Sequence, residues 1–430
     1  MKKGVSRLIV ALLLAVPTLF AALLGGCTGG GNYSFNWVLS VIKSQYYWGI
    51  TDDYEYNGSI KDFVATYLDI YSDYYTREEY IAKASSDAGN KSGVGISYIF
   101  VDKYDDETWQ HPDEQTGALI ETVMGNSPAY MSGLKRGELI TSGSYNGVTT
   151  QFDSAESFTG FIDARADGER FVLYSAQGGE HEMYKAEYTA SYCSMSTKTT
   201  DYSITYSGHG LRVQENSGGM SVLPDGAAYM RLEQFYGNAP AEMAALMQKF
   251  NAENCTSLIL DLRGNGGGFV DLMRDISVIY VGQLQNPLPN VMVAEDKKGN
   301  RQYTPLDKSK VASNYGFTQT SYLPVGTEVS VLADNGTASA SEALIGVLIE
   351  NGVIDYSDIY ISEFTQPYLK LTGTENKNGK TYGKGIMQST FVNYLTKEAL
   401  KLTTAKIYWP NGVKSIHDVG LTTEMGCHTL

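Results

Sequence analysis

The sequence predicts a multidomain protein of mixed α+β and α/β class, with a helical N-terminal segment, a β-rich domain and an α/β core. Its length of 430 residues corresponds to two or three domains of ordinary size. Apolar residues make up 43% and charged residues 19%, which is typical of a globular protein with buried cores. The third observation is the order of patterns along the chain: helical spacing, then short strands, then alternating strands and helices.

Acidic residues outnumber basic residues, 48 against 33, which gives a net charge of −15. A surface of this sign is repelled by phosphate backbones, and nucleic-acid-binding proteins carry the opposite imbalance. We therefore predict no nucleic-acid partner. The composition also excludes collagen, disorder throughout and a membrane protein with many spans.

Residues 1–27 have the pattern of a secretory signal peptide. A basic start, with Lys2, Lys3 and Arg7, precedes an uncharged apolar run over residues 8–24 that is marginal for crossing a bilayer. The Leu-Gly-Gly-Cys sequence that ends at Cys27 resembles the lipobox of bacterial lipoproteins, which implies a lipid on this cysteine. We expect a cell-envelope protein, lipid-anchored to a bacterial membrane and facing the periplasm or the exterior. The alternative is a secreted protein in which Cys27 has no role.

The other cysteines, Cys193, Cys255 and Cys427, give no sign of special chemistry. An odd number cannot form a full set of disulfides, and no Cys-x-x-Cys or Cys/His cluster suggests zinc. Cys255 precedes an apolar run and is expected to be a small core residue. We predict no metal and no other cofactor.

Residues 28–90 are predicted to form a short Gly-rich tether and then a helical segment. Apolar residues recur at helical spacing in IKDFVATYLDIYSDYY, within residues 33–88. Thr76 followed by Glu79 predicts a capping box at the start of the next helix.

From residue 91 to residue 189 the pattern changes to short strands, starting at a loop formed by Gly93, Val94, Gly95 and Ile96. A Ser-Pro-Ala sequence in the middle predicts the start of a short helix. The region resembles a PDZ domain, where backbone N–H groups of a glycine-rich loop bind a peptide's terminal carboxylate and the peptide adds as a strand. The resemblance implies that these four residues bind peptide. Another kind of small β-domain is the alternative.

Residues 190–430 are predicted to begin with a polar, strand-bearing connector, up to about Gly226, and to continue as an α/β core. Short apolar runs bounded by turn residues predict strands in this core, the last two of them buried: 228–235, 257–263 and 329–333. Helices are expected after the first strand, capped by Asn238, and after the last, from about Ser339.

A glycine-rich turn, GNGGG at residues 264–268, follows the second of these strands and opens a helix. It lacks the Gly-Lys-Ser/Thr ending of a phosphate loop, and Phe269 stands where a dinucleotide fingerprint needs its third glycine. A turn with exposed N–H groups at a helix N-terminus can hold an oxyanion. A purely structural tight turn is the alternative.

Ser339, in the sequence NGTASASE, lies after a strand and at the start of a helix. This placement raises a hydroxyl out of a sheet and directs the N–H of Ala340 to where an oxyanion would form. No histidine lies near this helix in a known Ser-His motif. His417 is the one that folding could bring to Ser339, although a solvated loop position is the simpler expectation for it.

Lys384, in the sequence KTYGKGIMQ, supplies a base of another kind. It lies between two glycines, so its backbone can approach other segments closely. A lysine buried away from water has a lowered pKa and can act as a base near neutral pH, as in Ser-Lys dyads. Considered alone, a lysine in a turn is more often a solvated surface charge.

Taken in order, LILDLRGNGGG, VLADNGTASASE and TYGKGIMQ resemble the C-terminal processing protease, or tail-specific protease, family. LDIYSDYYTREEY, AYMRLEQFYG and IYWPNGVKSIHDVGL resemble further segments of it, so the resemblance covers nearly all of the mature chain. It implies a serine endopeptidase with a PDZ domain and a ClpP/crotonase-like core.

The resemblance also assigns roles to residues of this chain. Ser339 matches the nucleophile, Lys384 the general base and Gln388 the side chain that orients the lysine. The oxyanion-hole positions are matched by three further residues: Gly267, Gly268 and Ala340. Glu342 and Thr381 match positions that support the site, and no cofactor is implied.

One departure from the family concerns the 45 positions that separate Ser339 from Lys384, which is longer than usual. The extra residues lie in SEFTQPYLKLTGTENKNGK, at 362–380, and are expected to form an inserted loop. Such a loop could cover the groove as a lid or block it.

These observations predict a lipid-anchored serine endopeptidase that binds C-terminal tails of proteins through its PDZ domain and cleaves them with a Ser-Lys dyad. The main alternative is a binding lipoprotein, since relatives of this core such as interphotoreceptor retinoid-binding protein carry apolar ligands. A catalytically silent enzyme with a closed lid, and a protease dedicated to one partner, are further alternatives.

Overall fold

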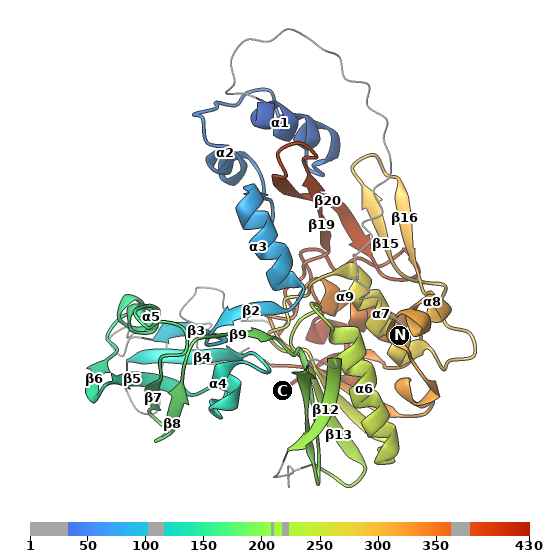
Figure 1. Ribbon diagram of the computed structural model, residues 1–430. Helices are drawn as coiled ribbons and strands as arrows, with labels where there is room; N and C mark the ends of the chain where they lie inside the picture. Colours follow the sequence, from blue (N-terminus) through green and yellow to red (C-terminus); the bar gives the residue numbers. More distant parts are fainter. Residues whose placement is uncertain (1–32, 102–115, 208–209, 217–222, 363–378) are drawn as a thin grey trace, which may run out of the picture.

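The computed structural model describes residues 33–101, 116–207, 210–216, 223–362 and 379–430. The signal peptide with Cys27, and all but the ends of the predicted insertion, lie outside this part. Figure 1 shows three bodies: a helical unit at the top, a β-rich unit at the lower left and an α/β core at the lower right. No helix in the described ranges has the length and the apolar character needed to cross a bilayer.

The helical unit contains three helices and a short strand: α1 (Tyr33–Gln45), α2 (Ile60–Tyr67), β1 (Asp73–Tyr75) and α3 (Arg77–Asp87). The predicted capping box opens α3, because Thr76 Oγ1 accepts from Glu79 N and Glu79 Oε2 accepts from Thr76 N. The apolar face of α1, with Phe35, Val38 and Ile42, is buried in one cluster with Leu400 and Leu402 of strand β20 (Ala399–Tyr408). A strand from the far end of the chain therefore completes the core of this unit.

The β-rich unit forms an antiparallel sheet with two short helices: β3 (Ile96–Val101), β4 (Gly117–Val123), α4 (Pro128–Met131), β5 (Leu139–Tyr145), β6 (Val148–Gln151), α5 (Ala155–Asp163), β7 (Phe171–Ser175) and β8 (Glu180–Met183). The strand order is β3-β4-β5-β7-β8, with β6 paired to β5. Helix α4 starts as expected, with Ser127 accepting from Tyr130 N and Pro128 in the first turn. Strand β3 forms the edge of the sheet, which is where an added strand would pair.

A two-stranded link joins the β-rich unit to the rest of the molecule. Strand β2 (Asn90–Gly93) leads into the unit and strand β9 (Ala186–Thr189) leads out of it, and the two pair antiparallel. Both lie between the β-rich unit and the core in Figure 1.

The main sheet of the core has the order β12-β11-β10-β13-β14-β17-β18-β21. Its strands are β10 (Cys193–Thr197), β11 (Asp201–Ser207), β12 (Gly210–Asn216), β13 (Ala227–Leu232), β14 (Ser257–Asp261), β17 (Glu328–Ala333), β18 (Ile359–Ile361) and β21 (His428–Thr429). From β13 to β21 neighbouring strands are parallel, and β10 to β12 are antiparallel. The predicted polar connector is thus an integral edge of the core sheet.

Three helices packed in the core belong to the strand-helix alternation: α6 (Ala239–Ala252), α7 (Val270–Val281) and α9 (Ala340–Glu350). Asn238 is the N-cap residue of α6, as expected, but its side chain makes no capping hydrogen bond, and Pro240 lies in the first turn. Proline fits in this turn because the N–H groups of a first turn have no hydrogen-bond acceptor within the helix, so the missing N–H of proline costs no hydrogen bond. Cys193, Cys255 and Cys427 are buried and unpaired, and Cys255 is part of the core as expected.

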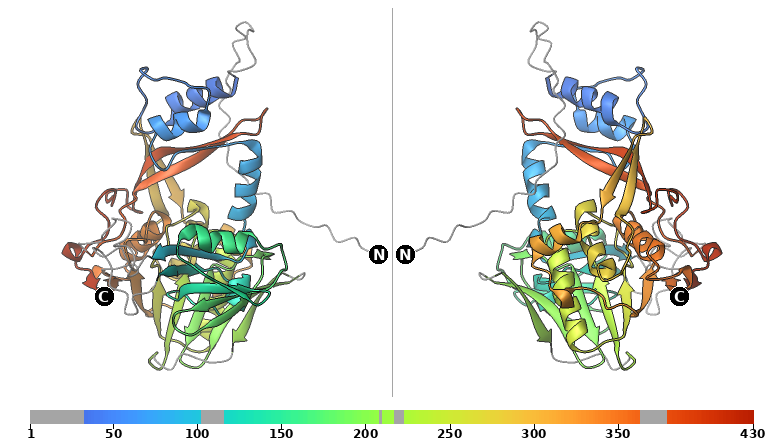
Figure 2. Two further views of the ribbon diagram at one scale, coloured as in Figure 1. Left: turned by 90° about the vertical axis from the view of Figure 1, so that its left-hand side faces the viewer. Right: turned by 90° about the vertical axis from the view of Figure 1, so that its right-hand side faces the viewer.

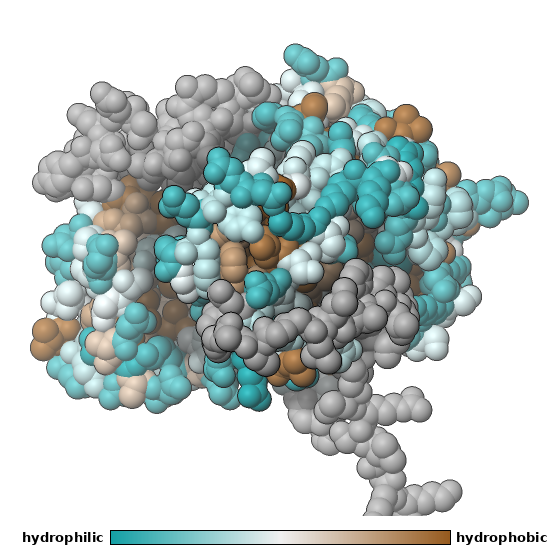
Figure 3. Space-filling view, turned by 90° about the horizontal axis from the view of Figure 1, so that it is seen from above, coloured by the Kyte–Doolittle hydropathy of each residue, from teal (hydrophilic) through white to brown (hydrophobic). Residues whose placement is uncertain are grey.

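A second sheet, with the order β1-β20-β15-β16 and β19 paired to β20, connects the core to the helical unit. Its further strands are β15 (Asn290–Asp296), β16 (Arg301–Pro305) and β19 (Ile386–Val392), and the remaining elements are α8 (Lys308–Tyr315), η1 (Gln319–Ser321), η2 (Tyr356–Asp358) and η3 (Thr423–Met425). Figure 2 shows the β19–β20 hairpin running from the core to the helices of the N-terminal unit. Seen from above, the visible described surface is mostly hydrophilic, with separate hydrophobic patches (Figure 3).

Candidate active site

Ser339 lies where the turn after β17 enters helix α9, as the sequence predicted. Its backbone has φ 58° and ψ −115°, a conformation that residues with a side chain rarely adopt. The preceding turn is held by Asp334, whose Oδ1 accepts from Gly336 N at 2.8 Å and from Gly264 N at 2.9 Å. The strain at Ser339 is therefore fixed by a buried carboxylate that also reaches the glycine-rich turn.

Asn265, in the glycine-rich turn, is a buried residue to which the sequence analysis gave no role. Its Nδ2 donates to Leu232 O at 2.8 Å, and its Oδ1 accepts from Gly267 N at 2.9 Å. Its carbonyl oxygen accepts from Ala338 N at 3.0 Å and from Ser341 Oγ at 2.8 Å. One residue thus connects strand β13, the glycines and residues on either side of Ser339, namely Ala338 and Ser341. An asparagine inside a Gly-Asn-Gly turn was the available signal.

The two glycines predicted to form the oxyanion hole have no room for a side chain. Gly267, at φ +100°, would place a Cβ 2.9 Å from Ser339 Cβ, and Gly268, at φ +146°, would place one 2.4 Å from Phe235 O. The Gly267 amide is occupied by Asn265. The Gly268 amide donates to no group in the described ranges, and the Ala340 amide lies in the first turn of α9, where helix geometry provides no acceptor.

Glu342, in the first turn of α9, brings the nucleophile and base segments together. Its Oε2 accepts from Ser339 N and from Lys384 N, each at 3.0 Å, so these two nitrogens lie within about 6 Å of each other. Its Oε1 accepts from Thr381 Oγ1 at 2.6 Å and from Gly383 N at 2.8 Å. Four donors from two segments of the chain converge on one carboxylate.

Burial governs the protonation of Glu342. The side chain is fully buried, and this desolvation raises its pKa to about 7, against the opposing effect of the hydrogen bonds from Thr381, Gly383, Ser339 and Lys384. Each of these partners donates to the carboxylate, so the ionised form is the one that this arrangement accommodates.

Lys384 lies just before strand β19 and is half-buried. Burial lowers the pKa of Lys384 below its ordinary value, and the nearby Lys401 cation lowers it further, while Asp69 and Glu342 act in the opposite direction. Its Nζ lies 4.6 Å from the centre of the Tyr71 ring. Within the described ranges it makes no hydrogen bond to Ser339 Oγ, so catalysis would require the lysine side chain to turn toward the serine.

Gln388 makes no hydrogen bond to Lys384 among the described residues. Its Nε2 donates to Thr403 Oγ1 at 3.1 Å, across the β19–β20 pair, where the two residues lie opposite each other. A bulge between Met387 and Gln388 shifts the register at this point. The amide nitrogen of Gln388 is thus engaged across the strand pair, while its Oε1 is the atom that would accept from Lys384.

The predicted peptide-binding loop is tightly built. Gly93 and Gly95 have φ +115° and +82°, and a Cβ on Gly95 would lie 2.1 Å from Ser127 Cβ. The Val94 carbonyl accepts from Ala129 N and the Gly95 carbonyl from Met124 N. The amides of Val94 and Gly95 donate to no group in the described chain, and Ile96 begins the edge strand β3.

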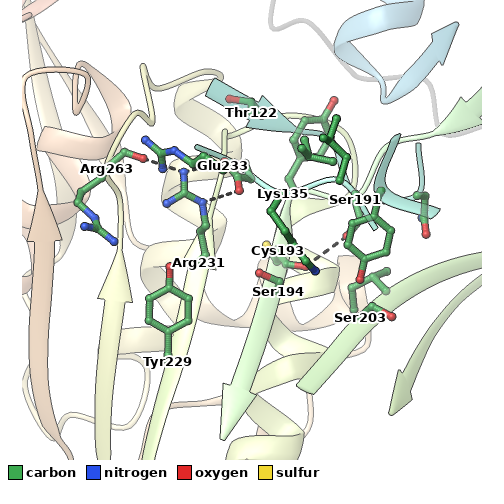
Figure 4. A pocket seen from close by; sticks show the side chains of 18 of the residues that line it. Thr122, Lys135, Ser191, Cys193, Ser194, Ser203, Tyr229, Arg231, Glu233 and Arg263 are labelled. Atoms are coloured by element: carbon green, nitrogen blue, oxygen red, sulfur yellow. Dashed lines mark hydrogen bonds and ion pairs between the residues drawn. The ribbon is translucent and has the colours of Figure 1, made fainter. Parts of the chain in front are cut away.

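A cavity of about 460 Å³ lies between the β-rich unit and the core sheet. Figure 4 shows its lining, with Lys135 from the β-rich unit and Arg231, Glu233 and Arg263 from the core. Arg231 is ion-paired to Glu233 and to the buried Asp261, which also pairs with Arg263. Neither Ser339 nor Lys384 lines this cavity, so it is distinct from the candidate catalytic site.

Comparisons with known proteins find relatives that cover most of this chain. Residues 226–355, which include the glycine-rich turn, Ser339 and Glu342, match the model of peptidase family S41. The chain is 23% identical over 426 residues to the carboxy-terminal processing protease CtpA of Bacillus subtilis, covering 97% of this chain and 75% of the relative. It is 22% identical over 376 residues to the chloroplastic C-terminal processing peptidase of Tetradesmus obliquus, covering 85% and 67%.

A solved structure assigned to the S41 proteases, from Bacteroides fragilis, superposes with a TM-score of 0.52 at 16% identity and covers 89% of each chain. At this identity the likeness concerns the fold, a mixed α/β multidomain architecture.

Proposed function

Because the chain belongs to peptidase family S41 and is a serine peptidase homologous to C-terminal processing peptidases, we propose that it cleaves proteins whose free C-terminal tails it first binds. The observation that carries the chemistry is the Glu342 carboxylate, which accepts from both Ser339 N and Lys384 N. It places a serine at a helix N-terminus beside a lysine whose pKa is lowered by burial.

In the proposed reaction neutral Lys384 accepts the proton of Ser339 Oγ, and the oxygen attacks a peptide carbonyl. The amides of Gly268 and Ala340 are the groups suited to stabilise the oxyanion, each worth about 3 kcal/mol. Lys384 then donates its proton to the leaving amine, and water hydrolyses the acyl-enzyme. The Gly267 amide could donate to the oxyanion, as predicted, only if its hydrogen bond to Asn265 Oδ1 were broken.

Tail binding is proposed for the β-rich unit. Strand β3 is a sheet edge, and the amides of Val94 and Gly95 are suited to donate to a terminal carboxylate. The resemblance to the family is the reason to propose an apolar tail; Ile96, Tyr98 and Phe100 themselves pack against the core of the unit, which includes Phe158 of α5.

The test uses the full chain in detergent and an unfolded protein substrate with an apolar tail, with products identified by mass spectrometry. We expect cleavage by the native chain, none by Ser339→Ala or Lys384→Ala, and much slower cleavage when the substrate's C-terminus is amidated. Cleavage by either variant would disprove the dyad, and equal rates on the amidated substrate would disprove capture through the carboxylate. Tail binding without any cleavage would favour the silent binding lipoprotein.

We also propose lipid anchoring at Cys27 in the cell envelope. The support is the basic start, the apolar run and the Leu-Gly-Gly-Cys sequence. Labelling of cells with a radioactive fatty acid should mark the native chain and not Cys27→Ser; labelling of both would contradict the assignment.

A further inference from the structure

The base Lys384 is covered by a residue from the opposite end of the chain. Tyr71 lies in the turn between α2 and β1, and its ring centre is 4.6 Å from Lys384 Nζ. Its hydroxyl lies 2.8 Å from the Tyr382 hydroxyl, two positions before Lys384. Ring and hydroxyl therefore contact the base segment at two points.

The turn that carries Tyr71 is itself rigidly held. Asp69 Oδ1 accepts from Tyr71 N at 3.2 Å and from Ser72 Oγ at 2.8 Å, and Asp69 Oδ2 accepts from Trp48 Nε1 at 3.0 Å. The following strand β1 pairs with β20, with Asp73 opposite Lys401. The position of the ring is thus set by the helical unit and by the second sheet together.

We propose that Tyr71 is a positioning residue for the catalytic base: its ring shields the Lys384 amine from water and its hydroxyl fixes the ring through Tyr382. The inference rests on the proposed role of Lys384 in proteolysis. It makes the N-terminal helical unit part of the catalytic site and not only a support for it.

The physical reason is a competition for the ammonium form of Lys384. An aromatic face attracts the ammonium ion, but it stabilises this ion less than the displaced water would. The charged groups that act on the amine are Lys401 of β20, Asp69 of the same turn as Tyr71, and Glu342 of α9. Asp69 and Asp418 act on the Tyr71 hydroxyl, whose pKa is raised mainly by burial. Replacing the ring by water should favour the ammonium.

The first test reads the amine directly and does not depend on cleavage. Trace acetylation with acetic anhydride modifies only neutral amines, and mass spectrometry gives the fraction labelled at Lys384 at each pH. In Tyr71→Ala we expect the labelling midpoint to rise by about one pH unit, which is about tenfold less neutral amine at pH 7. Tyr71→Phe, which keeps the ring but loses the hydrogen bond to Tyr382, should give only a small rise.

Ile70→Ala is the matched control, because Ile70 is the neighbouring residue and 86% exposed. It should leave the midpoint unchanged. A midpoint that is unchanged or lower in Tyr71→Ala would overturn the proposal, whether or not the chain cleaves any substrate. Tyr382→Phe provides a second variant with no loss of a ring, and a small rise is expected there.

The second test is the pH profile of kcat/KM with the unfolded substrate. Tyr71→Ala should move the acidic limb upward and lower kcat at pH 7 about tenfold, with KM little changed and the rate recovering at high pH. A purely structural defect would lower the rate equally at every pH. Higher activity of Tyr71→Ala at pH 7 would show that the ring holds the lysine away from Ser339, and would also overturn the proposal.

Discussion

Two buried glutamates, Glu342 in the candidate active site and Glu242 in helix α6 of the core, differ in how their oxygens are used. Both are fully buried near the start of a helix, and burial raises the pKa of each to about 7. Both bind backbone N–H groups of a distant segment. In composition and burial the two positions are nearly the same.

Their hydrogen bonds are distributed differently. Each oxygen of Glu342 accepts two donors, from the serine segment and the lysine segment. In Glu242 a single oxygen, Oε2, accepts from Ser191 Oγ, Tyr192 N and Cys193 N, and Oε1 has no partner among the described residues. Glu342 therefore accommodates an anion, whereas Glu242 has a place for a proton at Oε1.

The comparison of Glu342 with Glu242 shows that burial and a raised pKa do not by themselves identify a functional carboxylate. The arrangement of donors decides whether a carboxylate joins two segments of a candidate site or fixes a single segment between two strands. Four predictions test the distinction.

The largest effect is expected for Glu342→Gln. Its NH₂ group would face two donors in either orientation, which costs about 3 kcal/mol and displaces Ser339 relative to Lys384. Because a displacement of about 1 Å can cost 100-fold in rate, kcat/KM should fall at least about 100-fold. The measurement is cleavage of the unfolded substrate beside Glu242→Gln as the matched control. Equal activities of Glu342→Gln and Glu242→Gln would contradict the proposed difference between the two glutamates.

The second effect is a loss of stability as the pH rises. The folded state raises the pKa of both glutamates above 4.5, so it binds their protons more tightly than the unfolded chain does. Each contribution is present below pH 4.5 and is lost between pH 4.5 and 7, by about 3 kcal/mol per group. Asp334, with its pKa raised to about 6, acts in the same direction.

Urea denaturation at pH 5 and pH 7 measures this loss. Glu242→Gln removes one titrating group and should reduce the difference between the two pH values by about 2 kcal/mol. An unchanged difference would show that Glu242 does not titrate in this range in the folded state.

The third effect concerns Thr381→Val, which removes one donor to Glu342 Oε1 and also the acceptor of Leu421 N. The free energy of unfolding should fall by about 1–3 kcal/mol, because a buried N–H loses its partner. We expect a loss of activity smaller than in Glu342→Gln, since Oε2 keeps both donors. Thermal melting and cleavage assays check this, with Thr381→Ser expected to restore both properties.

The smallest effect is expected for Glu242→Gln at pH 5. The amide oxygen can accept the three donors, and the NH₂ group occupies the place where the native carboxyl holds its proton. The free energy of unfolding should change by less than about 1 kcal/mol, and cleavage by less than about twofold. A large loss at pH 5 would mean that Glu242 is ionised there and that the contrast with Glu342 fails.

The sequence predicted most elements around the site because each depends on local signals. The capping box at Thr76, the short helix at Pro128 and the strand-turn-helix around Ser339 are set by residues within a few positions. Asn238 also occupies the N-cap position of α6 as expected, although its side chain makes no capping hydrogen bond. The joint placement of Ser339 and Lys384 came from the resemblance of motifs to a family.

Contacts between residues far apart in the chain could not be predicted from the sequence. Nothing local to Tyr71 indicates that its ring would cover Lys384, and nothing local to Gln388 indicates that Thr403 would take its amide. Pairing of β1 and β19 with β20 produces both contacts.

The amino-acid sequence was enough to predict the order of elements, the family, and a candidate serine and lysine, because these follow from local propensities and from short motifs. The tertiary structure alone decided which groups surround them: the four donors on Glu342, the Asn265 contact that occupies the Gly267 amide, and the Tyr71 ring over the base. The physical reason is that hydrogen-bond satisfaction and desolvation are properties of a buried environment, which forms only when distant segments pack together.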